Sequence, residues 1–213
     1  MPEKPSDDSR TPAGDEVSIE KLEQTAASMP DSANAHYNLG LELVQRGEWD
    51  RGLLEFRTAL KLKPGLLEAR INVAGILLQK GDYDGCIEES LKALQYRPDL
   101  IQGCINIGIA FMQKGMMEQA VQSFHNALNI DPNSAVAHLN LGNAYLSLGE
   151  IDKSIEHNGR AVEIHPGFAM AHNNLAVALF HKGETERARK HVNEAKRHGY
   201  PVNADFLKEL GQE

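Results

Sequence analysis

A period of 34 residues runs through most of this 213-residue chain and constrains its fold more than any other feature. Four residue types keep one phase of the period: Gly47, Gly81, Gly115, Gly149 and Gly183; Ala59, Ala93, Ala127, Ala161 and Ala195; Asn38, Asn72, Asn106, Asn140 and Asn174; Pro30, Pro64, Pro98, Pro132 and Pro166. At average glycine usage, five glycines at one preset spacing arise by chance about once in a million. The chain is therefore an array of repeats.

Each repeated position has a physical role in a pair of helices. A helical pattern of about 14 residues ends at each repeated glycine, which can adopt the left-handed conformation that closes a helix. A second amphipathic pattern follows, for example over residues 49–63, and stops before the repeated proline, which cannot continue a helix. Small residues in the first helix allow close approach of the second: Gly40, Ala74, Gly108, Gly142 and Ala176. We expect antiparallel helix pairs that stack on one another.

The repeat resembles the tetratricopeptide repeat, whose unit reads W-x2-L-G-x2-Y, then A-x3-F, then P. The matching residues are His36, Leu39, Gly40, Leu43, Gly52, Phe56 and Pro64 in the first repeat; Cys104, Ile107, Gly108, Phe111, Ala120, Phe124 and Pro132 in the third; and His138, Leu141, Gly142, Tyr145, Ser154 and Pro166 in the fourth. No repeat has the initial Trp, and Ser90 and Asn158 stand where Phe is usual. The resemblance implies an all-α, right-handed solenoid of antiparallel helix pairs.

The period also divides the chain. Residues 1–17 are rich in Pro, Ser, Asp and Glu and are expected to be disordered. Residues 18–211 are expected to form a single solenoid domain. Its parts are a half-repeat at 18–32, full repeats at 33–66, 67–100, 101–134, 135–168 and 169–202, and a capping helix at 203–211. End segments of this kind cover the apolar faces that terminal repeats would otherwise expose.

Composition excludes several classes of protein. The formal net charge is −8, which argues against a nucleic acid or an anionic membrane surface as the main partner. No apolar run reaches the ~18 residues of a membrane span, and the polar start of the chain lacks a signal-peptide core. Two cysteines do not make a disulfide framework and suit a reducing compartment. A cytoplasmic location without membrane insertion is expected.

The resemblance implies a concave surface formed by the first helices, lined by positions 2, 5, 6, 9, 12 and 13 of each repeat. Asparagine recurs at position 6, and most of the other residues are apolar or amides. An amide offers both a donor and an acceptor, as a peptide backbone does. The predicted peptide-binding groove comprises Tyr37, Asn38, Leu41, Ile71, Asn72, Gln79, Ile105, Asn106, Ile109, Met112, Gln113, Leu139, Asn140 and Asn174. The asparagines could equally bond to neighbouring helices only.

A second use of this fold, the clamp that grips an acidic C-terminal tail, is disfavoured. It needs Lys and Asn in one repeat, Asn in the next, and Lys and Arg in the one after. Those places hold Tyr37, Leu41, Asn72, Gln102 and Asn106, and shifting the frame by one or two repeats supplies no cation. Recognition of a carboxylate depends on such cations.

No constellation for catalysis, a metal or a cofactor stands out. His36, His138 and His172 occupy position 4, where partly buried structural histidines are expected rather than zinc ligands. Cys86 and Cys104 are expected to act as small apolar residues. Phosphate-loop, nucleophile-elbow, H-E-x-x-H and C-x-x-C motifs are absent from the sequence. We therefore expect a protein that is not an enzyme.

Two functions remain open. The first is an adaptor or scaffold that binds a peptide segment of a partner protein in its concave groove. The second is a self-associating scaffold for a multiprotein assembly, since arrays with exposed apolar surfaces can form homo-oligomers head to tail.

Overall fold

The computed structural model describes residues 18–211, which form helices joined by short turns, with no strand in that range. The expected disordered segment, residues 1–17, lies outside the described part. The described chain divides into two compact units, residues 18–64 and 65–211. No helix between residues 18 and 211 has the length and apolar character that crossing a membrane requires.

The helices follow the predicted repeat closely. The first unit contains α1 (Ile19–Ser28), α2 (Ala33–Gln45) and α3 (Trp49–Leu62). The second unit contains α4 (Leu67–Gln79), α5 (Tyr83–Tyr96), α6 (Ile101–Gln113), α7 (Met117–Ile130), α8 (Ala135–Ser147), α9 (Ile151–Ile164), α10 (Ala169–His181), α11 (Thr185–Arg197) and α12 (Ala204–Glu209).

The repeated glycines end the first helix of each pair as predicted. Gly47 has a φ of 81°, and the four glycines at the same position have φ between 74° and 85°. Gly47 N–H donates to Val44 O, and Glu48 N–H donates to Leu43 O. This pattern satisfies carbonyls at the helix end and recurs in every full repeat. The second helix ends before the proline: α3 ends at Leu62, and Lys63, with φ −137° and ψ 86°, lies outside the helical region.

The first unit is a helix followed by a helix pair. α1 packs on α2, and α2 packs on α3. Ser18 and Ser32 accept hydrogen bonds from backbone N–H groups in the first turns of α1 and α2. The buried apolar residues between α1 and α2 are Ile19, Ala26, Ala35, Leu39 and Leu43.

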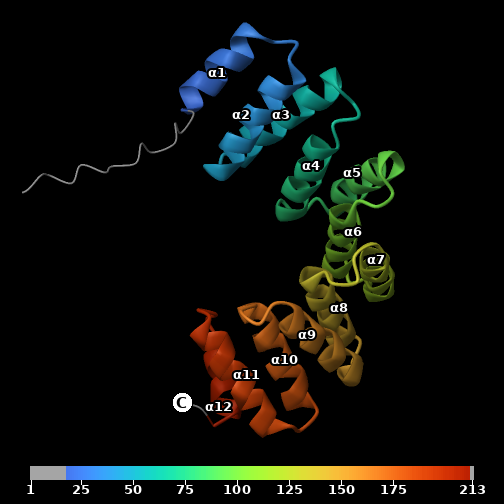
Figure 1. Ribbon diagram of the computed structural model, residues 1–213, viewed down its shortest axis with the longest axis vertical. Coiled ribbons are helices and arrows are strands. Elements are labelled where there is room, and N and C mark those ends of the chain that lie inside the picture. The colour runs from blue at the N-terminus through green and yellow to red at the C-terminus, as the bar shows by residue number, and fades with distance from the viewer. Residues whose placement is uncertain (1–17, 212–213) are drawn as a thin grey trace, which may run out of the picture. The chain divides into compact units, whose positions relative to one another are not determined.

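The second unit is a stack of helix pairs (Figure 1). The first helices of neighbouring repeats touch: α4 contacts α6, α6 contacts α8, and α8 contacts α10. Within residues 65–211, the backbones of the second helices of neighbouring repeats lie farther apart than those of the first helices. Because first helices are the closer set, the stack curves with these helices on its inner side. At the end of this unit, α12 and the residue that follows it cover α10 and α11: Phe206 of α12 packs against Phe180, and the side chain of Leu210 is fully buried.

Helix approach within each pair is set by two facing positions. In the third repeat, a Cβ at Gly108 would lie 2.4 Å from the ring of Phe124, so only glycine leaves room for that ring. The same holds for Gly40 and Phe56 in the first unit, where the distance is 2.7 Å. Where the first residue is alanine the second is smaller than Phe, as in the pairs Ala74 with Ser90 and Ala176 with Val192.

Candidate protein-binding surface

One row of side chains recurs along the same face of each first helix in the second unit. A helix places residues i, i+4, i+7 and i+11 on one face. We call these residues the inner stripe: Glu68, Asn72, Gly75 and Gln79 on α4; Gln102, Asn106, Ile109 and Gln113 on α6; Val136, Asn140, Asn143 and Ser147 on α8; Met170, Asn174, Val177 and His181 on α10.

The inner stripe is partly apolar and carries little charge. Val136 is 46% exposed and Met170 is 44% exposed. Glu68 is the one carboxylate of the stripe, and the stripe contains no Lys or Arg. The surface therefore lacks the cations that an acidic ligand needs.

Amides cluster where α8 meets α10. Asn174 Nδ2 donates to Asn143 Oδ1 at 2.7 Å, and Asn173 Nδ2 donates to Asn174 Oδ1 at 3.2 Å. Asn140 Nδ2 donates to the carbonyl of Val136 at 2.8 Å. Within the described residues, Asn143 Nδ2, Asn140 Oδ1 and Asn173 Oδ1 have no hydrogen-bond partner. One donor group and two acceptors are thus left at the half-buried surface.

The predicted groove residues differ in exposure. Asn38, Leu41, Gln79 and Gln113 are exposed; Tyr37, Ile71, Asn72, Ile109, Met112, Asn140 and Asn174 are half-buried; Ile105, Asn106 and Leu139 are buried at 4% exposure each. The Asn106 amide accepts a hydrogen bond from Gln102 Nε2 at 2.9 Å. Ile105 packs in a core cluster with Cys104, Ala127 and Ala137. The asparagine column is therefore not uniform, because one of its members is enclosed and others reach the surface.

Sequence reasoning missed two members of the amide cluster, Asn143 and Asn173. Both lie at positions that the family resemblance assigns to the concave surface, numbers 9 and 5 of the repeat. They stand alone in their columns, since other repeats have Leu, Gly, Ile or Val at position 9. Comparing the same position in successive repeats finds residues that recur. It does not find different residues that meet where two helices contact each other.

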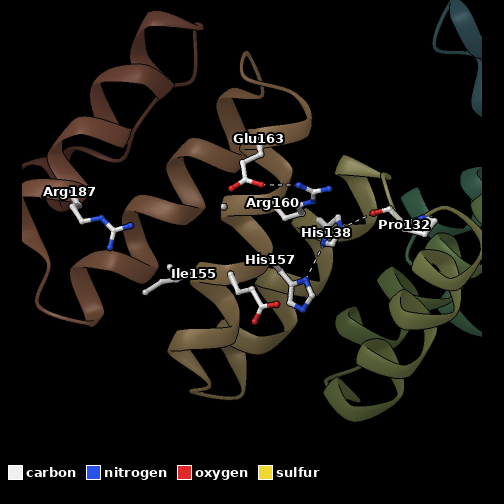
Figure 2. Close-up of a pocket in the computed structure, with 9 residues that line it drawn as sticks. Pro132, His138, Ile155, His157, Arg160, Glu163 and Arg187 are labelled. Atoms are coloured by element: carbon white, nitrogen blue, oxygen red, sulfur yellow. Dashed lines mark hydrogen bonds and ion pairs between the residues drawn. The ribbon is translucent and has the colours of Figure 1, made fainter.

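A pocket of about 520 Å³ lies beside the second helix α9 and is lined by Pro132, His138, Ile155, Glu156, His157, Gly159, Arg160, Glu163 and Arg187 (Figure 2). None of these residues belongs to the inner stripe. Arg160 is paired with Glu163 at 2.9 Å. No group of three or more His, Cys, Asp or Glu side chains within residues 18–211 is arranged to hold a metal ion.

The two cysteines are buried, as the small-apolar interpretation predicts. Burial raises the pKa of the Cys86 thiol to about 11 and also raises the pKa of Cys104. The thiolate is the reactive form, so neither residue is a nucleophile near neutral pH. We expect less than a tenth of the native protein to react with iodoacetamide at pH 7 under conditions that fully label the urea-unfolded chain. Rapid labelling of native Cys86, measured by peptide mass spectrometry, would contradict this burial.

Helix pairs of 34 residues with glycine-closed first helices define a class of helical repeat protein. Tetratricopeptide repeat models match residues 16–66, 37–99, 135–168 and 159–190, and a TPR repeat model matches residues 108–149. The chain belongs to the tetratricopeptide repeat family, whose members mediate protein–protein interactions and are typically non-catalytic. No curated protein matches the sequence.

Solved structures share the fold at low sequence identity. YrrB, described as a TPR protein with an unusual peptide-binding site, is 18% identical with a TM-score of 0.66, covering 92% of this chain and 100% of its own. MamA from Desulfovibrio magneticus RS-1 is 20% identical with a TM-score of 0.68, covering 78% and 94%. The APC/C hetero-tetramer Cut9–Hcn1 gives 20% identity and a TM-score of 0.78, covering 90% of this chain and 39% of that one. These likenesses establish the fold alone.

Proposed function

We propose that this protein is a non-catalytic adaptor whose inner stripe binds an extended segment of a partner protein. The observation that carries the proposal is the pairing of unused amide atoms with exposed apolar side chains where α8 meets α10. Asn143 Nδ2 and Asn140 Oδ1 provide a donor and an acceptor. Val136 on α8 and Met170 on α10 are exposed apolar residues of the same inner stripe.

The amides suit a backbone and the apolar residues suit side chains. An extended peptide presents an N–H and a C=O at every residue, and an Asn side chain can meet both. Burying the exposed surfaces of Val136 and Met170 against a ligand side chain contributes about 25 cal/mol for each Å² removed from water. Specificity would then come from bulky apolar residues in the ligand, and an acidic tail would gain nothing from a stripe without cations. The peptide-binding site named for YrrB supports this use of the fold.

Replacing Val136 and Met170 together by Asp should weaken peptide binding at least tenfold, because two charges would then have to be desolvated by an apolar ligand. Ligands are selected from a displayed library of random peptides on the wild-type protein, and dissociation constants are measured by fluorescence anisotropy. Ile105 is unsuitable for this test, since its side chain is part of the core.

The matched control is Leu91→Asp, which changes an equally exposed apolar residue (50%) on the second helix α5. Wild-type affinity in Leu91→Asp, with lost affinity in the double variant and unchanged circular dichroism in both, supports the proposal. Equal affinity in all three proteins would refute it. Sedimentation of the free protein at high concentration tests the self-associating scaffold, which requires a homo-oligomer and predicts loss of that oligomer in the double variant.

A further inference from the structure

Two pairs of histidines join the first and second helices of the fourth and fifth repeats. His138 on α8 contacts His157 on α9, with their Nδ1 atoms 3.0 Å apart (Figure 2). His172 on α10 contacts His191 on α11 with the same Nδ1 to Nδ1 distance of 3.0 Å. The offset is 19 residues in both pairs. The same contact therefore recurs at the same two positions of the repeat in two neighbouring repeats.

The protons in each pair are fixed by a neighbouring carbonyl. His138 Nε2 lies 3.1 Å from the backbone oxygen of Pro132, and His172 Nε2 lies 2.9 Å from that of Pro166. A carbonyl oxygen only accepts, so Nε2 carries the proton in both histidines. In the neutral ring Nδ1 is then the acceptor. Consequently the second-helix histidines, His157 and His191, donate from Nδ1.

This arrangement limits how many protons a folded pair can bind. One added proton has a place on Nε2 of His157, because that atom is not used in the contact. A second proton would have to go on Nδ1 of His138, which already accepts the hydrogen bond. With that second proton bound, the Nδ1–H groups of His138 and His157 would point at each other across 3.0 Å, and both rings would be positively charged. The same count applies to His172 and His191, so each folded pair accepts one proton and each unfolded pair accepts two.

The groups around the pairs do not reverse this count. The His138–His157 pair is faced by His125 of α7, Asp131 of the preceding turn, Tyr145 of α8, Lys153, Glu156, Arg160 and Glu163 of α9, and Arg187 of α11. The His172–His191 pair is faced by His198, Arg187 and Glu194, with His165 close to His198 across Gly167. The cations among these groups are held by carboxylates of their own, since Lys153 pairs with Glu150, Arg160 with Glu163 and Arg187 with Glu184. Within the described residues, no carboxylate forms an ion pair with a histidine of either pair.

Burial acts in the same direction as the paired geometry. It lowers the pKa of His138 and, together with the neighbouring His138, lowers the pKa of His157. Burial and the neighbouring His172 lower the pKa of His191.

Other repeats fill these two positions differently. In the first unit, His36 Nδ1 faces the carboxylate of Glu55 at 2.6 Å. In the second repeat, Arg70 pairs with Glu89 at 2.6 Å. A carboxylate partner accommodates a fully protonated histidine or a permanent cation, whereas a second histidine does not. The third repeat has Cys104 and Ser123, which do not ionise between pH 5 and 7.

We propose that the two histidine pairs make the fourth and fifth repeats an acid-labile segment, which opens as the pH falls below about 6.5 while the second and third repeats stay folded. The sign follows from proton linkage: where the unfolded state binds more protons than the folded state, stability falls as the pH falls. Loss begins near the ordinary histidine pKa of about 6.5 and grows below it. The equilibrium constant for opening then rises toward tenfold per pH unit for each pair.

Hydrogen exchange of the full-length protein tests the proposal. Backbone exchange is followed by mass spectrometry at pH 7.5, 6.5, 5.5 and 5.0, with rates corrected for the intrinsic pH dependence. We expect protection in α8 to α11 to fall at least tenfold between pH 6.5 and 5.0, with a change under threefold in α4 to α7. Equal changes in both groups of helices would overturn the proposal.

The variant His157→Glu with His191→Glu reproduces the pairing of His36 with Glu55. It should reverse the sign, so that protection in α8 to α11 rises as the pH falls from 7.5 to 5.5. His181→Gln, at an exposed histidine of α10, is the control and should keep the wild-type pH dependence. A double variant with the wild-type pH dependence would refute the proposal.

Nitrogen-15 NMR spectra of the histidine side chains in the wild-type protein report the protonation of each ring nitrogen. This measurement does not depend on whether the variants fold. His138 should keep an unprotonated Nδ1 throughout the folded range, while His157 or His191 gains a proton. Full protonation of both rings of a pair in the folded protein would also overturn the proposal.

Discussion

Replacing Gly108 by alanine is expected to lower the free energy of unfolding by roughly 2 kcal/mol, although alanine is the better helix former. The added Cβ would lie 2.4 Å from Cε1 and 2.7 Å from Cζ of Phe124. That ring is fully buried, so it cannot move aside without disturbing the core between α6 and α7. The cost of overpacking therefore exceeds the gain in helix propensity.

Gly75→Ala is the matched control, because Gly75 also lies inside a first helix and a Cβ there would meet nothing within 4 Å. It should raise the stability by about 0.5–1 kcal/mol, the usual benefit of removing a glycine from a helix interior. Urea unfolding followed by circular dichroism measures both changes. Similar effects of the two substitutions would show that the fit between Gly108 and Phe124 does not determine the helix spacing.

A second substitution isolates the contact. Gly108→Ala combined with Phe124→Ser recreates the pair formed by Ala74 and Ser90 in the second repeat. If the clash is the cause, adding Gly108→Ala to the Phe124→Ser protein should cost nothing further, although Phe124→Ser alone is strongly destabilising. Full additivity of the two changes would contradict a direct contact.

The repeat, the helix bounds and the helix ends could be predicted from the sequence because they depend on local rules. Gly47 and Pro64 act through backbone conformation, which neighbouring repeats do not alter. The phase of the period then places every later helix. This is why the expected pairs of helices are observed, as α2 to α11.

The exposure of individual side chains in the predicted groove could not be predicted in this way. Asn106 and Asn140 occupy the same position of the repeat, yet the first is buried beneath Gln102 and the second is half-exposed. The difference depends on how α4, α6 and α8 approach one another, which the period alone does not encode. His157 and His191 were overlooked for a similar reason, since their role depends on a partner 19 residues earlier in another helix. The shared offset in two repeats was the available signal.

Asn158→Phe is expected to stabilise the protein by roughly 1–3 kcal/mol, which is unusual for a substitution in a buried position. Asn158 is fully buried, and its Oδ1 has no hydrogen-bond partner in residues 18–211, while its Nδ2 bonds to Ser154. A Cβ at Gly142 would lie 2.4 Å from Asn158 Nδ2, so Asn158 occupies the place that Phe124 takes opposite Gly108. The glycine that admits a phenyl ring is therefore already present.

The full test pairs Asn158→Phe with Ser154→Ala, because Ser154 would otherwise lose its partner, and the pair then matches Ala120 and Phe124 of the third repeat. A rise in Tm of about 2–4 °C per kcal/mol is the expected readout. Ser90→Phe is the opposing control. There the facing residue is Ala74, fully buried and already carrying a Cβ, so the same change to Phe should lower the Tm. Destabilisation by both substitutions would mean that a glycine in the first helix is not sufficient to admit the ring. The packing around α8 and α9 would then leave no room for a Phe side chain at position 158.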